Sequence, residues 1–213
     1  DLRGHGDSAR VPDGEYELQQ FLDDLLRIAQ STREPPVLVG ASMGGLLGLA
    51  LAGETVPPPF RALVLVDITP RWESAGVARM LAFMRAHPHG FADYDEAIAT
   101  ISEYLPHRTR AKRQLEPLLR RGPDGRLRWH WDPALLDTIA REGERHQPRL
   151  RAAARKIDIP VLLLSGGRSD VVSRDTIAEF MQLLPHARHE EIPHATHMLA
   201  GDANDAFAAE IEK

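Results

Sequence analysis

The pentapeptide Gly40-Ala41-Ser42-Met43-Gly44 follows the apolar run Val37-Leu38-Val39 and precedes a segment of leucines and small residues. The β-branched run predicts a buried strand, and the segment after Met43 predicts a helix. Between them, the Gly-x-Ser-x-Gly pattern is typical of a sharp strand-to-helix turn that raises the serine hydroxyl above a sheet. Ser42 is therefore a candidate nucleophile. The alternative is a glycine-rich turn that only packs the helix close to the strand.

Further apolar runs predict more strands of the same sheet. They cover residues 62–66 and 161–164, and residues 188–192 are expected to form a last strand. Apolar residues at helical spacing, such as Phe21, Leu22 and Leu25, lie between the runs. Nearly unbroken apolar strands that alternate with helices indicate a parallel sheet covered on both faces. The predicted fold class is α/β, with a mostly parallel sheet flanked by helices.

A long insertion separates the second and third of these strands. We expect residues 72–155 to form a helical cap, and residues 1–71 and 156–213 to form the core domain. Helical spacing recurs in the cap, at the positions Val77, Met80, Leu81 and Met84, then Ile98, Ile101 and Leu105, then Leu115, Leu118 and Leu119. The segment Gly122-Pro123-Asp124-Gly125 is expected to interrupt it.

All three tryptophans of the chain, Trp72, Trp129 and Trp131, fall in the cap segment. A buried indole needs a roomy apolar site and a partner for its ring N–H. These rings are therefore candidates for lining a substrate pocket. Pinning the cap to the core is an equally good interpretation.

The cap also carries a run of basic residues. It comprises Arg108, Arg110, Lys112, Arg113, Arg120, Arg121, Arg126 and Arg128. Acidic residues such as Glu116 and Asp124 interrupt the run, which favours a solvated surface over a site that attracts an acidic substrate.

Composition excludes several classes of function. A net charge of -5 over 213 residues argues against a nucleic-acid partner bound through broad phosphate neutralisation. The absence of cysteine excludes disulfides and thiolate chemistry. No apolar run is long enough to span a membrane. We expect a cytoplasmic protein that acts on a small-molecule substrate without a cofactor; the oligomeric state stays open.

Three candidate catalytic residues each follow a predicted strand, where ligands bind in open α/β sheets. Ser42, Asp170 and His197 occur in the order nucleophile, acid, histidine. His197 would accept the proton of the serine hydroxyl, and Asp170 would fix the histidine tautomer. The backbone N–H of Met43 would stabilise the oxyanion.

Two of these assignments have rivals. Asp67 follows the second strand and is an alternative acid. It could instead have a structural role and cap the loop that leads into the helical insertion. His194 is an alternative to His197. A metal site is a further possibility, because two His-x-x-His pairs occur at His186, His189, His194 and His197. A predicted strand separates the pairs and no carboxylate spacing completes a site, so we expect no metal.

Several segments together resemble the α/β-hydrolase superfamily. They are the loop from Asp1 to Ser8, the turn from Gly40 to Gly44, the segment Asp67-Ile68-Thr69-Pro70 that leads toward the helical cap, the loop from Gly166 to Asp170, and His197-Met198 with the Asn204 to Phe207 segment. The chain is most similar to lidded serine esterases and to the cofactor-free haloperoxidase and epoxide-hydrolase-like group. Members of this group that open epoxides have aspartate where this chain has Ser42, so the resemblance implies ester chemistry. It also implies that strands and a second oxyanion donor precede Asp1.

The leading functional hypothesis is a serine hydrolase that cleaves a small or medium carboxylic ester through an acyl-enzyme. Cleavage of a thioester or a carbon–carbon bond, or perhydrolysis, could use the same three residues. A non-catalytic binding module is disfavoured, because all three positions hold chemically competent residue types.

Overall fold

The computed structural model describes residues 1–104, 115–198 and 204–211, and the chain divides into two compact units. The first unit comprises Asp1–Tyr16 and Ala78–Arg141, and the second comprises Glu17–Val77 and Glu142–Lys213. The boundaries of core and cap expected from the sequence stay a prediction.

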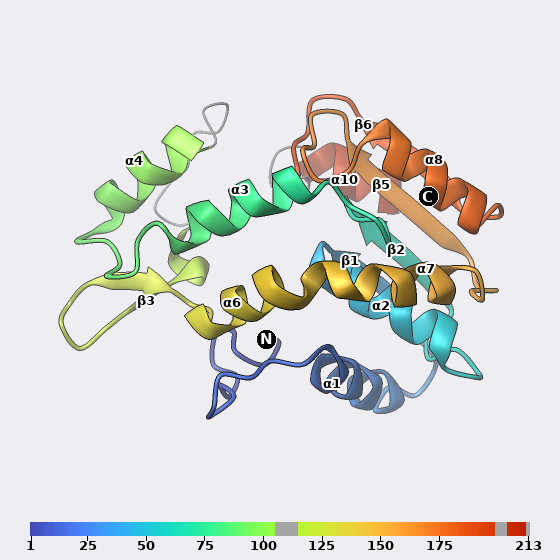
Figure 1. Cartoon of the computed structure of the whole chain (residues 1–213), viewed down its shortest axis with the longest axis horizontal. Helices are drawn as coiled ribbons and strands as arrows, with labels where there is room; N and C mark the ends of the chain where they lie inside the picture. The colour runs from blue at the N-terminus through green and yellow to red at the C-terminus, as the bar shows by residue number, and fades with distance from the viewer. Residues whose placement is uncertain (105–114, 199–203, 212–213) are drawn as a thin grey trace. The chain divides into compact units, whose positions relative to one another are not determined.

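A parallel sheet forms the centre of the second unit (Figure 1). Its strands are β1 (Val37–Ala41), β2 (Ala62–Val66), β5 (Val161–Gly166) and β6 (Arg188–Ile192), in the order β1-β2-β5-β6. All three neighbouring pairs are parallel. The carboxyl ends of the four strands therefore lie along one edge of the sheet. The three strands predicted from apolar runs, and the last strand expected at residues 188–192, are confirmed.

Helices cover both faces of this sheet. One set contains α1 (Leu18–Gln30), α2 (Met43–Glu54), α7 (Gln147–Ala154), which follows the short 3-10 turn Gly143–His146, and α8 (Arg174–Leu183). Helix α2 contacts β1, β2, α1 and α7, and α7 contacts α8. Enclosed in this way, α2 buries residues all round, which is why its sequence is apolar on every side.

The opposite face of the sheet is covered by α10 (Asn204–Ile211). Phe207 and Ile211 of α10 pack against a buried cluster that includes Val64 of β2 and Leu164 of β5. Leu63 points the other way, toward Gly48 of α2, as the alternation of side chains along a strand requires. Residues on both sides of β2 are buried, as the sequence predicted for this sheet.

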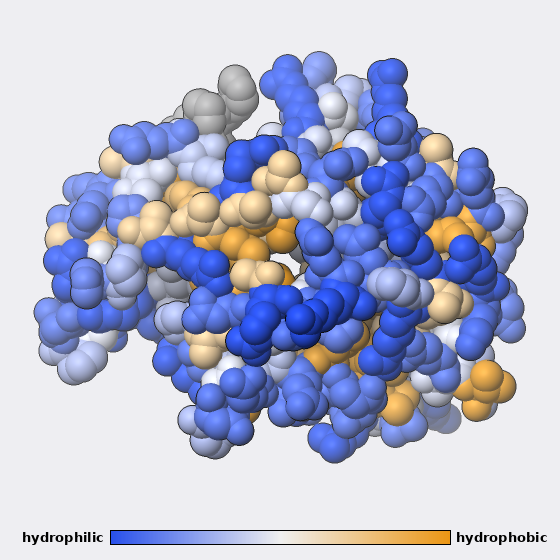
Figure 2. Space-filling view, viewed as in Figure 1, coloured by the Kyte–Doolittle hydropathy of each residue, from blue (hydrophilic) through white to orange (hydrophobic). Residues whose placement is uncertain are grey.

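Strand β1 lies at one end of this sheet and pairs with β2. Its side chains differ in exposure: Val37 and Val39 are 41% and 42% exposed, whereas Leu38 faces α2. Most of the surface seen in Figure 2 is hydrophilic, with apolar side chains gathered in smaller patches between charged ones.

The first unit contains helices and a hairpin. Helix α3 (Ser74–Arg85) enters it from the second unit, and α4 (Tyr94–Tyr104) and α6 (Pro133–Glu142) follow. Its buried cluster consists of Phe91, Ala97, Ile101, Leu115, Leu119 and Leu127. The helices expected around Met80 and Ile98 are confirmed, and Leu105 lies outside the described residues.

The third helix expected in the cap, around Leu115, Leu118 and Leu119, does not include Leu118 or Leu119. A 3-10 turn covers Glu116–Leu118, and β3 (Leu119–Arg121) pairs antiparallel with β4 (Leu127–Trp129). Pro117 in the turn has no N–H to donate within a helix. The Gly-Pro-Asp-Gly segment closes the hairpin, where the Gly122 N–H donates to the Arg126 carbonyl at 2.8 Å. Leu119 and Leu127 are both buried, but they lie on the two strands of the hairpin and not on one helix face.

Among the helices of the described ranges, none combines the length and the apolar character needed to cross a membrane.

Candidate active site

Ser42 occupies a strained turn between β1 and α2. Its φ of 47° lies in the left-handed region that non-glycine residues seldom adopt. The Ser42 N–H donates to the Val66 carbonyl at 3.1 Å, which ties the turn to the end of β2. This is the geometry predicted for a nucleophile at a strand-to-helix turn.

The helix after Ser42 lies directly against the strand before it. A Cβ atom on Gly40 would lie 2.6 Å from backbone atoms of Gly44 and Gly45, closer than real Cβ contacts come. A Cβ atom on Gly44 would meet nothing within 4 Å in the described part of the chain. The two glycines of the motif therefore have different roles, and the close approach depends on Gly40.

This difference makes a matched test. We expect Gly40→Ala to push the start of α2 away from β1, which should cost about 1–3 kcal/mol of unfolding free energy through overpacking. Displacement of Ser42 should lower kcat about 10²-fold. Urea unfolding and ester-hydrolysis kinetics measure both effects. Gly44→Ala is the control and should retain wild-type stability; equal losses in the two variants would contradict the argument.

Asp67 follows β2 directly and is completely buried. Its Oδ1 accepts the Gly166 N–H at 2.8 Å, and its Oδ2 accepts the Ser169 hydroxyl at 2.5 Å and the His197 Nδ1–H at 2.8 Å. A buried carboxylate requires such donors, because desolvation of a charge is costly. These three bonds fix the position of the carboxylate at the carboxyl end of the sheet.

His197 lies in the loop that follows β6. This loop is joined to the end of β5 by two backbone bonds, from Gly167 N–H to the Ile192 carbonyl and from Arg168 N–H to the Ala195 carbonyl, each 2.9 Å long. Because the Asp67 carboxylate already accepts from the Gly166 N–H and the Ser169 hydroxyl, we assign the proton of its bond with the imidazole to His197 Nδ1. The neutral imidazole then has its lone pair on Nε2, the tautomer that a general base requires.

All three predicted catalytic residues follow strands whose carboxyl ends lie along one edge of the sheet. His197 is hydrogen-bonded to Asp67, the rival assignment for the acid. Ala41 pairs with Val66, so Ser42 and Asp67 are the next residues on adjacent strands, which lie about 4.8 Å apart in sheets. Across the described ranges, no hydrogen bond joins the Ser42 hydroxyl to His197, and such bonds often tighten only when substrate is bound.

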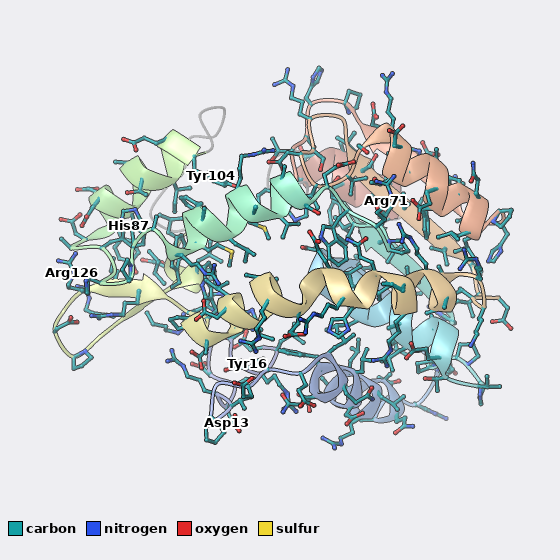
Figure 3. All side chains as sticks on the ribbon, in the orientation of Figure 1. Asp13, Tyr16, Arg71, His87, Tyr104 and Arg126 are labelled. Carbon is teal, nitrogen blue, oxygen red and sulfur yellow. The ribbon has the colours of Figure 1, made fainter. Side chains whose placement is uncertain are left out.

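An ion-pair network holds the segment that follows Asp67. Glu179 of α8 accepts from Arg71 Nε at 2.5 Å and from Arg151 Nε of α7 at 2.6 Å. Figure 3 shows Arg71 beside α8. Burial raises the pKa of the Glu179 carboxyl, but the hydrogen bonds from Arg71 and Arg151 outweigh burial, and the pKa lies below its usual value. The network therefore joins the loop after β2 to two helices of the same unit.

Met43 is the first residue of α2. The first N–H groups of a helix have no acceptor within the helix, and the helix dipole adds positive potential there. Because Met43 directly follows Ser42, the position of its N–H suits the predicted role of oxyanion donor.

The three tryptophans are distributed over both units. Trp72 is buried in the second unit. Trp129 and Trp131 belong to the first unit and stack, with ring centroids 4.7 Å apart and an angle of 9° between planes. Trp129 also packs edge-on against Phe91 at 5.4 Å, and its buried Nε1 has no acceptor within the described part of the chain. Trp129 and Trp131 are both half-buried, and the contacts of Trp129 with Phe83, Phe91 and Trp131 give it a packing role.

The His-x-x-His pairs make separate contacts. His186 Nε2 lies 3.1 Å from the Ile159 carbonyl, His189 Nε2 lies 2.8 Å from Ser165 Oγ, and His197 binds Asp67. Burial lowers the pKa of His189, against the opposing charges of Glu191 and Glu190. Among the described residues, no group of three or more His, Cys, Asp or Glu is arranged to hold a metal ion.

The basic side chains of the hairpin have local partners. Arg128 forms two bonds to Asp124, Arg126 donates to the carbonyls of His89 and Gly90, and Arg120 lies 3.9 Å from Asp7. These contacts agree with a solvated surface. Arg108, Arg110, Lys112 and Arg113 lie outside the described residues.

A strand-to-helix turn with a strained serine, and a carboxylate and histidine pair at the carboxyl edge of the same parallel sheet, are the features that the sequence predicts for a hydrolase. Comparison with known proteins agrees with this class. A family profile described as the alpha/beta hydrolase fold matches residues 1–203. The chain belongs to this family and is a hydrolase.

Individual relatives are also hydrolases. The chain is similar to a 3-hydroxybutyrate-oligomer hydrolase of Cupriavidus necator, with 31% identity over 212 residues, covering 92% of this chain and 71% of the relative. It is similar to a mouse (Mus musculus) sn-1-specific diacylglycerol lipase, with 31% identity over 228 residues, covering 97% of this chain and 67% of the relative. A solved structure of an E-2-(acetamidomethylene)succinate hydrolase matches with a TM-score of 0.86 and 28% identity, covering 99% of this chain and 78% of that one.

Proposed function

We propose that this chain hydrolyses small or medium carboxylic esters through Ser42, His197 and Asp67. The observation that carries the proposal is the bond from His197 Nδ1 to the buried Asp67 carboxylate, at the sheet edge where Ser42 follows β1. Among the relatives, a 3-hydroxybutyrate-oligomer hydrolase and a diacylglycerol lipase support an ester as the substrate class.

The reaction follows from these positions. His197 Nε2 takes the proton of the Ser42 hydroxyl as its oxygen attacks the ester carbonyl. Asp67 stabilises the imidazolium that forms, and the Met43 N–H donates to the oxyanion. The imidazolium then gives its proton to the departing alcohol, and an acyl group remains on Ser42. Water, activated by the same histidine, releases the carboxylic acid and restores the serine.

The substrate pocket is proposed to include tryptophans of the cap. Trp131 is the stronger candidate, because it is partly exposed and stacked on a ring that is itself fixed by Phe91. Trp72 and Trp129 contribute mainly shape, since Trp72 is buried and Trp129 is held on several sides. A cytoplasmic location is part of the same proposal.

Covalent labelling tests this proposal. A fluorophosphonate probe should form one adduct per chain, and peptide mass spectrometry should locate the adduct on Ser42. A series of p-nitrophenyl esters of increasing acyl length should then give a maximum of kcat/KM at short or medium chains. The absence of an adduct, or an adduct on another serine, would contradict the proposal. Turnover of thioesters alone, or only with added peroxide, would assign the alternative chemistry on the same residues.

A further inference from the structure

The loop after β5 supplies two donors to the carboxylate on the neighbouring strand. Gly166 donates its backbone N–H to Asp67 Oδ1, and Ser169 donates its hydroxyl to Asp67 Oδ2. Ser169 lies immediately before Asp170, the residue that the sequence favoured as the acid. This segment therefore contributes the Ser169 side chain to the proposed site, in addition to the backbone N–H of Gly166.

The direction of the Ser169 hydroxyl follows from its other partners. A serine hydroxyl has one proton and two acceptor lone pairs. The N–H groups of Val171 and Val172 both donate to Ser169 Oγ, each at 3.1 Å. With the oxygen accepting from two backbone donors, its one proton is directed at Asp67 Oδ2. Ser169 therefore acts as a donor to Asp67, and the carboxylate accepts.

The same carboxylate oxygen also accepts from His197 Nδ1. The torsion that turns a carboxylate about its Cβ–Cγ bond is broad, so bonds from outside the residue decide its plane. Gly166 holds one oxygen and Ser169 holds the other in the plane that presents Oδ2 to the imidazole. We propose that Ser169 is a positioning residue, which orients the Asp67 carboxylate and through it the ring of His197. This inference rests on the proposed function for its kinetic consequences.

The chain offers a matched control four residues further on. The Ser173 hydroxyl accepts the Thr176 N–H at the start of α8 and donates to Glu73 at 2.6 Å. Each of the two serines accepts from at least one backbone N–H group and donates to a carboxylate. That carboxylate is Asp67 for Ser169 and Glu73 for Ser173. Ser173→Ala measures what the loss of a structural hydroxyl in this segment does by itself.

We expect Ser169→Ala to lower kcat for an ester about 10- to 100-fold, the usual range for a residue that orients a functional group. KM should change by less than about threefold, because Ser169 orients Asp67 and does not bind substrate. Ser169→Thr, which keeps the hydroxyl, should restore most of kcat. Ser173→Ala should lower the melting temperature and leave kcat close to that of the wild type.

A second measurement does not depend on activity. The proton between His197 Nδ1 and Asp67 should give a downfield proton NMR signal, which Asp67→Asn identifies by removing it. Ser169→Ala should shift or broaden this signal, and Ser173→Ala should not. If Ser169→Ala fails to fold, Ser169→Cys replaces it, because a thiol occupies the same place and is a weak donor.

The outcomes separate the two proposals. Wild-type kcat and an unchanged downfield signal in Ser169→Ala would overturn the positioning role while Ser42 labelling still supports the proposed function. If Ser42 is not labelled, the proposed function fails, and the response of the downfield signal to Ser169→Ala still decides whether Ser169 positions the pair. Equal losses of kcat in Ser169→Ala and Ser173→Ala would also overturn the inference, since they would show a general effect of loop stability.

Discussion

Replacement of Ser42 with alanine should lower kcat for ester hydrolysis by about 10⁴- to 10⁶-fold, because no other group can form the acyl-enzyme. The fold should be retained. The Ser42 side chain makes no capping bond at the start of α2, and alanine has the same difficulty as serine with a φ of 47°. The loss should therefore appear in the chemistry and leave the unfolding free energy close to that of the wild type.

Initial rates with a p-nitrophenyl ester, together with urea unfolding, measure the two quantities for Ser42→Ala. Ser31→Ala is a suitable control, because Ser31 is an exposed serine at the end of α1 whose hydroxyl donates to the Ile28 carbonyl. It should keep full activity. Ester hydrolysis at the wild-type rate in Ser42→Ala would end the assignment of the nucleophile, whatever the state of the other site residues.

The strand-to-helix turn at Ser42 was predictable because its signal is local. The Gly-x-Ser-x-Gly pattern, the apolar strand before it and the helix after it all lie within residues 37–54. The clash that a side chain on Gly40 would cause explains why the motif needs a glycine at its first position. Strands β2 and β5 were predictable for the same reason, since burial on both faces leaves continuous apolar runs.

The carboxylate that bonds to His197 was harder to predict because two aspartates satisfy the same pattern. Asp67 follows β2, Asp170 follows β5 by a few residues, and these two strands are neighbours whose carboxyl ends lie at one edge. What distinguishes them is contact across about a hundred residues, from Gly166 and Ser169 to Asp67. No spacing in the sequence reports such contacts. The positive φ of 49° at Asp67 is equally invisible to apolar patterning.

In the hairpin of the first unit, a pattern in the sequence predicted the wrong secondary structure. Leu118 and Leu119 have helical spacing with Leu115, yet Leu118 lies in a 3-10 turn and Leu119 in a strand. Spacing over five residues is too short to distinguish the two structures. Pro117 was the better signal, because a proline within a short apolar stretch favours a turn.

The choice between the two aspartates leads to the second large effect that we expect. Asp67→Asn should lower kcat about 10³- to 10⁴-fold, because the amide changes the tautomer of His197. With its oxygen held by the Gly166 N–H, an asparagine at this position would turn its NH₂ group toward His197. The imidazole would then accept at Nδ1 and carry its proton on Nε2, where it can no longer take the proton of Ser42.

Asp170→Asn is the comparison that decides the acid. We expect its loss of kcat to be at least about 100-fold smaller than that of Asp67→Asn, because His197 Nδ1 donates to Asp67. Steady-state kinetics at a fixed pH, with fluorophosphonate labelling to count intact sites, measure both variants. The double variant should be close to Asp67→Asn alone, since two changes on one proton path are not additive. If Asp170→Asn shows the larger loss, the histidine turns to Asp170 during catalysis, and the contact with Asp67 belongs only to the resting enzyme.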